Sequence, residues 1–133
     1  MKKYITILRP AHWVKNLFVF LPIFFSGKLL DEKLFFQSCI AFVLFSFLAS
    51  IVYIINDYVD IDSDRNHPEK CKRPLASGAI SKTEGLLLAT FLFLLIAAVL
   101  VYFNSSWSFP LWQFEIVLGG YFLLNLLYTF KLK

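Results

Sequence analysis

Long apolar stretches separated by short charged segments are the main feature of this sequence. Residues 34–55 contain no charged side chain over 22 positions, and two further apolar stretches cover residues 83–103 and 111–130. An α-helix rises about 1.5 Å per residue, so each stretch can cross a hydrocarbon core of about 30 Å. The pattern therefore predicts three transmembrane helices.

A fourth stretch, residues 11–30, is less regular, because its charge-free core from 17 to 27 is short and contains Pro22. If this stretch also spans the membrane, eleven of the 13 Lys and Arg residues lie on one side: Lys2, Lys3, Arg9, Lys15, Arg65, Lys70, Lys72, Arg73, Lys82, Lys131 and Lys133. Lys28 and Lys33 lie on the other side. If residues 11–30 do not span the membrane, the N-terminal arm lies on the side opposite the loop of residues 56–82, and the basic residues no longer favour one side. The positive-inside rule therefore predicts four spans, with both termini and the loop of residues 56–82 in the cytoplasm.

The composition also indicates a lipid bilayer as the solvent. The chain is 59% hydrophobic and 19% aromatic, with a mean hydropathy of +0.68, whereas a soluble domain spreads its charges over its whole surface. The net charge of +4 does not indicate a nucleic-acid partner, because no basic helix, RNA-binding aromatic motif or zinc-ligand spacing accompanies it. We expect an all-α, polytopic transmembrane helical bundle.

The large loop begins with acidic residues directly after the second predicted span. If the helix continues through them, Asp57, Asp60 and Asp64 fall within a sector of about 60° on one face, while Asp62 points elsewhere. Three carboxylates on one face repel one another unless a cation joins them. Mg²⁺ prefers such oxygen ligands and completes its shell with water and phosphate oxygens. The spacing favours a Mg²⁺ site, although a solvated acidic patch at a helix end is the simpler interpretation.

Several basic residues follow the acidic run closely. Arg65, Lys70, Lys72 and Arg73 are candidates to bind phosphate groups that the metal also holds. The positive-inside bias also explains each of them taken singly. Both interpretations stay open at this point.

Two motifs of the loop resemble signatures of the UbiA superfamily of intramembrane prenyltransferases. Asn56, Asp57, Asp60 and Asp64 match its first signature, N-D-x-x-D-x-x-x-D, in full, and residues 73–78 resemble the R-P-L-x-S-G motif that follows it. The pair is specific, because chance occurrence directly after a transmembrane helix is improbable. The loop is therefore similar to the metal-binding loop of that superfamily.

The resemblance extends over the whole chain. Residues 8–16 resemble the start of the family, and residues 128–133 resemble the tyrosine–lysine stretch after its fourth helix. Within the superfamily, residues 9–20 together with residues 25–27 most resemble the decaprenyl-phosphate phosphoribosyltransferase branch. This implies the first half of a bundle of about nine helices, the structure that satisfies backbone groups in lipid.

The resemblance also implies a reaction and a site. In that branch 5-phosphoribose passes from phosphoribosyl diphosphate to a polyprenyl phosphate, with Mg²⁺ held against the diphosphate by residues that correspond to Asp57, Asp60 and Asp64. These are the expected catalytic and metal-binding residues, in a bacterial plasma membrane with the acidic loop cytoplasmic. The expected substrate-binding residues are Asn56, Lys15, Arg65, Arg73 and Tyr128.

Three other functions remain compatible with the sequence. The same metal site serves family members that move a prenyl group from a prenyl diphosphate to an aromatic acceptor. A second is a cation transporter, which would place its acids within the spans, whereas the acids here lie in the loop. A third is a non-catalytic membrane protein, which would need no carboxylate triad. Since the family's second aspartate motif is absent from these 133 residues, we expect this chain alone to be inactive, as a fragment or a truncated product.

Overall fold

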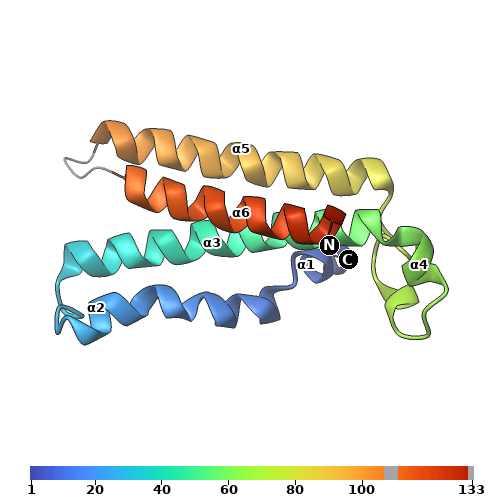
Figure 1. Cartoon of the computed structure of the whole chain (residues 1–133), viewed down its shortest axis with the longest axis horizontal. Helices are drawn as coiled ribbons and strands as arrows, with labels where there is room; N and C mark the ends of the chain where they lie inside the picture. The colour runs from blue at the N-terminus through green and yellow to red at the C-terminus, as the bar shows by residue number, and fades with distance from the viewer. Residues whose placement is uncertain (107–110, 132–133) are drawn as a thin grey trace.

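Helices make up all the regular structure in residues 1–106 and 111–131, the part of the chain that this computed structural model describes (Figure 1). The elements are α1 (Lys2–Leu8), the 3₁₀ helix η1 (Pro10–Phe20), α2 (Leu21–Phe25), α3 (Glu32–Val59), α4 (Ile61–Arg65), the 3₁₀ helix η2 (Lys70–Lys72), α5 (Lys82–Ser106) and α6 (Trp112–Lys131). The predicted all-α bundle is confirmed.

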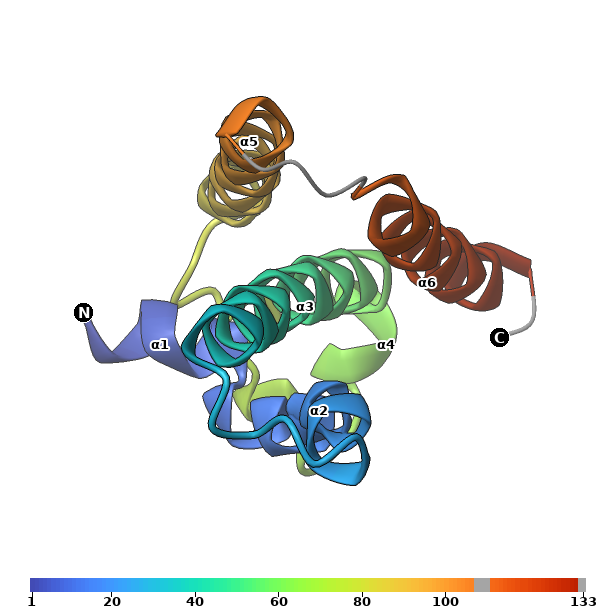
Figure 2. The ribbon, with the colours of Figure 1, turned by 90° about the vertical axis from the view of Figure 1, so that its left-hand side faces the viewer.

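The long helix α3 lies at the centre of the bundle, with α5 and α6 on one side and η1 and α2 on the other (Figure 2). Its buried residues follow one another almost without a gap from Leu44 to Ile54, because neighbouring elements cover it on more than one face. By contrast, α5 buries few of its apolar side chains, namely Ala89, Leu92 and Ile96. This limited burial suits contact with lipid chains.

Two of the described helices, α3 and α5, are long and apolar enough to cross a membrane. The predicted span at residues 11–30 corresponds to η1 followed directly by α2. A 3₁₀ helix rises about 2.0 Å per residue, more than an α-helix, so residues 10–25 extend over about 30 Å despite their small number. This length matches the thickness of a hydrocarbon core, but residues 10–25 include Lys15, and the first span stays a prediction.

Local sequence signals explain where the long helices begin. Asp31 caps α3, because its Oδ1 accepts a hydrogen bond from the backbone N–H of Leu34 at 3.0 Å. At the start of α5, Glu84 N–H donates to Ser81 Oγ at 3.1 Å, and Ser81 N–H donates to Glu84 Oε2 at 2.7 Å. This reciprocal pair is a capping box, as the sequence Ser-Lys-Thr-Glu predicts.

The helix does not continue unbroken through the acidic residues. Helix α3 ends at Val59, and Asp60 adopts φ −91° and ψ 6° before the short α4 begins. The predicted unbroken extension is therefore wrong at Asp60, although hydrogen bonds of the helical kind continue across this point, from Asp60 N–H to the carbonyl of Asn56 and from Asp64 N–H to the carbonyl of Asp60. Asp57 and Asp64 are buried, Asp60 is half-buried and Asp62 is exposed.

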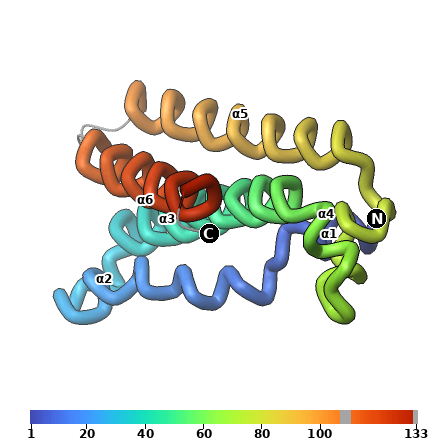
Figure 3. Tube along the Cα trace, turned by 45° about the vertical axis from the view of Figure 1, so that its right-hand side comes forward, coloured from blue at the N-terminus to red at the C-terminus, as the bar shows by residue number. Residues whose placement is uncertain are grey.

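The rest of the loop is packed rather than extended. Leu75 and Ile80 are 2% and 1% exposed, and Ile80 N–H donates to the carbonyl of Pro74 at 3.0 Å. Gly78 supplies the left-handed turn between them, at φ 79°, a conformation that costs glycine little. The loop, α1 and the end of α3 consequently lie at the same end of the bundle (Figure 3).

Candidate functional site

Two buried aspartates form the centre of the site at this end of the bundle. The side chains of Asp57 and Asp64 are 1% and 2% exposed. One nitrogen of Arg73, Nη1, donates to Asp57 Oδ1 at 3.1 Å and to Asp64 Oδ2 at 2.8 Å. The two carboxylates meet at a common point, and Arg73 supplies the cation there.

A second arginine binds Asp57 from the N-terminal segment. Arg9 Nη2 donates to Asp57 Oδ1 at 2.6 Å and to Oδ2 at 2.8 Å, and its guanidinium lies 4.9 Å from the centre of the Tyr53 ring. Its backbone is left-handed, at φ 51°, which a non-glycine residue rarely adopts and which concentrates at functional sites. We did not predict Arg9 as a site residue from the sequence, although the Leu-Arg-Pro motif that contains it was a usable signal.

Hydrogen bonds with α3 fix the positions of neighbouring elements relative to the two aspartates. Asn56 Oδ1 accepts a hydrogen bond from Thr129 Oγ1 of α6. Ser50 Oγ donates to the carbonyl of Leu8 at 2.7 Å and accepts from Trp13 Nε1 at 3.0 Å. The N-terminal segment and α6 are thereby fixed to the end of the helix that carries Asp57.

The two carboxylates at the centre of the site are matched by two arginine side chains. Two buried carboxylates face two guanidiniums whose side chains are 21% and 27% exposed. A buried carboxylate without a partner costs several kcal/mol, whereas paired charges with satisfied hydrogen bonds are tolerated. Each buried carboxylate therefore has a guanidinium partner within hydrogen-bonding distance.

The remaining predicted residues take different positions. Arg65 donates from Nε to the carbonyl of Ala76 at 3.2 Å, so it supports the loop. Lys15 is exposed on η1, and Tyr128 is exposed on α6. Asp60 is half-buried at the break between α3 and α4. The structure thus brings together Asp57, Asp64 and Arg73, with the others around or away from them.

A polar pocket of about 320 Å³ opens beside Asp57. Its lining residues are Thr6, Arg9, His12, Asp57, Glu69, Lys72, Arg73 and Pro74. The ring of His12 is held by Tyr53, whose hydroxyl lies 3.1 Å from Nδ1. With two arginines, a lysine and a histidine on its walls, this pocket is suited to an anionic group.

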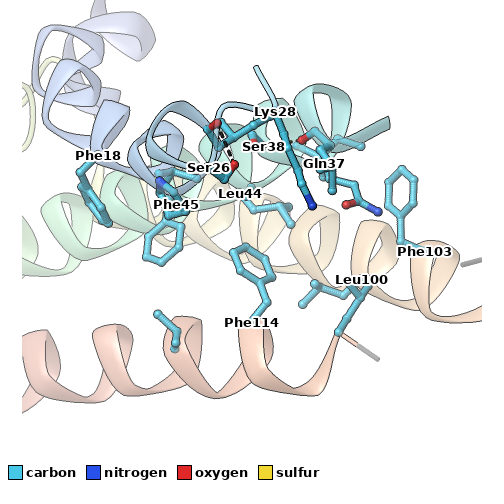
Figure 4. A pocket seen from close by; sticks show the side chains of 18 residues that line it. Phe18, Ser26, Lys28, Gln37, Ser38, Leu44, Phe45, Leu100, Phe103 and Phe114 are labelled. Carbon is cyan, nitrogen blue, oxygen red and sulfur yellow. Dashed lines mark hydrogen bonds between the residues drawn. The ribbon is translucent and has the colours of Figure 1, made fainter. Parts of the chain in front are cut away.

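A larger apolar cavity lies at the other end of the bundle. It measures about 630 Å³ and is lined by residues of η1, α2, α3, α5 and α6. Figure 4 shows Phe45, Leu100 and Phe114 facing it from three different helices, with Lys28 and Gln37 at one side. Its walls suit a hydrocarbon chain better than a polar molecule.

Comparison with known proteins identifies the family. Residues 17–133 match the UbiA prenyltransferase family. The chain belongs to that family. Its members are integral membrane helical bundles, so the apolar helices α3 and α5 of this UbiA-family chain are membrane helices.

This UbiA-family chain is similar to several named proteins. The chain is 35% identical over 133 residues to the decaprenyl-phosphate phosphoribosyltransferase of Mycolicibacterium smegmatis, an alignment that covers 97% of this chain and 40% of the relative. The protein of the same name from Corynebacterium glutamicum is 40% identical over 78 residues, covering 57% and 24%. The nodulation protein NoeC of Azorhizobium caulinodans is 37% identical over 83 residues, covering 62% and 27%. The chain therefore spans from 24% to 40% of the length of these relatives.

UbiA-family enzymes generally use Mg²⁺ with diphosphate substrates, so the residues here can be tested against that ion. The donors are carboxylate oxygens, which Mg²⁺ prefers, and those of Asp57 and Asp64 already converge on one cationic nitrogen. Within residues 1–106 and 111–131, no three Asp, Glu, His or Cys side chains are gathered as a ready metal site. The donor set fits Mg²⁺, and the guanidinium of Arg73 holds the position between the two carboxylates.

Proposed function

We propose that the protein is a Mg²⁺-dependent intramembrane transferase that moves 5-phosphoribose from phosphoribosyl diphosphate to a polyprenyl phosphate. The observation that carries the proposal is the buried Asp57–Asp64 pair, which lies directly beside a pocket lined by Arg9, Lys72 and Arg73. A carboxylate pair for a divalent ion next to basic side chains for phosphates is the arrangement that a diphosphate donor requires.

The proposed reaction replaces one bond at C1 of the ribose with another. The C1–oxygen bond to the diphosphate breaks, the diphosphate leaves with the bonding electrons, and an oxygen of the lipid phosphate forms the new bond. Mg²⁺, when bound by Asp57 and Asp64 with Asp60 nearby, supplies Lewis-acid neutralisation of the leaving group. Asn56, fixed by Thr129, keeps the end of α3 in place, and Arg73 and Lys72 bind the departing phosphate oxygens.

The basic side chains of the polar pocket favour a donor that carries a further phosphate group, separate from its diphosphate. A prenyl diphosphate carries charge on its diphosphate alone, whereas phosphoribosyl diphosphate also carries a 5-phosphate. The pocket offers His12 and Lys72 in addition to Arg73, which is more than one diphosphate needs. The two named phosphoribosyltransferase relatives give this donor independent support.

The acceptor is proposed to lie along α3. The apolar cavity begins about twelve residues before Asp57 on that helix, and twelve helical residues span about 18 Å. A polyprenyl tail seated among Leu44, Phe45 and Phe114 can therefore reach the site with its phosphate. The same cavity also suits the tail of a prenyl diphosphate, so it favours prenyl transfer to an aromatic acceptor as the second candidate function.

A transfer assay separates the two candidates. The protein, expressed from its complete gene in membranes, is given labelled phosphoribosyl diphosphate, polyprenyl phosphate and Mg²⁺. Label is expected to enter the lipid extract and to stay out of it when the chelator EDTA is added. Label that moves instead from a prenyl diphosphate to a hydroxybenzoate or naphthoate would replace the first candidate with the second. No transfer from either donor would contradict both.

A further inference from the structure

The two arginines of the site bind the aspartates in different ways. Arg9 forms a bidentate pair with Asp57 at 2.6 and 2.8 Å, and the ring of Tyr53 covers its guanidinium. Arg73 touches both carboxylates through the single atom Nη1, at 3.1 and 2.8 Å. Arg9 is therefore a fixed partner of Asp57 alone, whereas Arg73 takes the bridging position that a divalent ion would occupy.

The backbone of Arg73 is anchored while its side chain reaches the pocket. Arg73 N–H donates to the carbonyl of Lys70 at 3.0 Å, and its own carbonyl accepts from Ser77 N–H at 2.8 Å. Pro74 and Leu75, which follow it, are buried. The guanidinium is partly exposed and lines the polar pocket while it contacts the carboxylates, so it lies between the two.

Lys72, which lines the same pocket, can also accept a change of partner. Lys72 pairs with Glu69 at 3.3 Å, and both side chains are more than two thirds exposed. An exposed ion pair of this kind contributes little stability, so Lys72 is easily released to an anion. Arg73 and Lys72 would then bind the anion together, while Arg9 continues to neutralise Asp57.

We propose that Arg73 is an exchangeable counter-ion: it bridges Asp57 and Asp64 when no metal is bound, and a divalent cation displaces it into the polar pocket, where it binds a phosphate of the donor. This proposal rests on the proposed function for the identity of the donor. Metal and anion then assist one another, because the metal releases Arg73 and the anion holds it. Such a coupling acts equally in both directions.

The test measures metal and anion separately in the Arg73→Gln variant. The protein from its complete gene is reconstituted in lipid nanodiscs and titrated with Mn²⁺ alone, followed by electron paramagnetic resonance. Charge-assisted hydrogen bonds compete strongly with a cation, so removal of Arg73 is expected to tighten Mn²⁺ binding about tenfold. With saturating Mn²⁺, pyrophosphate binding measured by calorimetry is expected to weaken about tenfold.

The expected changes in Mn²⁺ affinity and pyrophosphate affinity have opposite signs, which distinguishes the exchange from simpler roles of Arg73. A purely structural arginine would weaken both ligands, and a simple phosphate ligand would leave Mn²⁺ affinity unchanged; either result overturns the exchange. Lys70→Gln is the matched control, since Lys70 is an exposed cation of the same loop. It should change Mn²⁺ affinity by less than about twofold, because an exposed charge in water acts weakly.

A second measurement uses the wild-type protein and does not depend on a variant folding. Phenylglyoxal modifies arginines that are free of ion pairs, and mass spectrometry reports the rate at each position. Addition of Mn²⁺ is expected to accelerate modification of Arg73, with Arg65 as the internal reference. An unchanged or slower rate at Arg73 would contradict the proposal. If Mn²⁺ displaces Arg73 but no label is transferred from phosphoribosyl diphosphate, the proposed function is wrong while the exchange of Arg73 is supported.

Discussion

Asp57 connects the parts of the site that are far apart in the sequence. Arg9 reaches it from the N-terminal segment and Arg73 from the large loop, with Asp64 sharing the second arginine. Its neighbour Asn56 contacts α6. A change at this position therefore affects the packing of several segments as well as the charge of the site.

At the scale of single residues, we predict that Asp57→Asn, Asp60→Asn and Asp64→Asn each abolish Mg²⁺-dependent binding of the diphosphate donor. Removing a carboxylate charge removes a ligand that a hard cation requires. Asp62→Asn is the matched control: Asp62 is exposed, and most binding should remain. Titration calorimetry with donor and Mg²⁺ measures the effect. Equal losses at Asp62 and Asp64 would show that overall loop charge, not a defined site, binds the donor.

At the scale of elements, the start of α5 determines how the loop returns to the bundle. Glu84 takes part in the capping box and also accepts a hydrogen bond from Tyr4 at 2.8 Å. One carboxylate thus closes the helix and ties it to α1. The loop that carries Arg73 is held between this cap and the break at Asp60.

We predict that Ser81→Ala destabilises the protein by about 1 kcal/mol, the usual contribution of a helix cap. The substitution removes the oxygen that accepts from Glu84 N–H. Thr83→Ala, which alters an exposed residue of the same turn, should change stability by less than about 0.5 kcal/mol. Thermal unfolding in detergent compares the two variants. A similar shift in both would mean that the cap contributes nothing specific.

At the scale of the whole molecule, the chain runs along the bundle four times in alternating directions (Figures 1 and 3). α1, the loop with α4 and the end of α6 consequently lie at one end. The four-span arrangement with these segments in the cytoplasm stays a prediction. Residues 132 and 133, including Lys133, lie outside the described residues.

Cysteine labelling tests the orientation in the membrane. In a variant without native cysteines, cysteines at Lys2 and Lys72 should react with an impermeant reagent only from the cytoplasmic side, because positively charged loops are retained there. A cysteine at Ser106, at the far end of α5, should react from outside. Labelling of position 72 in intact cells would overturn the four-span arrangement.

The sequence alone determined the features that depend on near neighbours in the chain. Hydrophobic stretches gave the helices, the Ser-Lys-Thr-Glu spacing gave the cap of α5, and the aspartate motif pointed to the loop that forms the site. Each of these signals is read within a few residues, because helix periodicity and capping bonds act over one or two turns.

Only the tertiary structure decided how the carboxylates are neutralised. The partners of Asp57 lie 48 and 16 residues away in the chain, so their contact depends on how η1 and the loop pack against α3. The Leu-Arg-Pro motif marks Arg9 in the sequence, but only the packing shows that Arg9 pairs with Asp57. Helix periodicity and capping act over one or two turns, so they do not report which side chains meet across such separations.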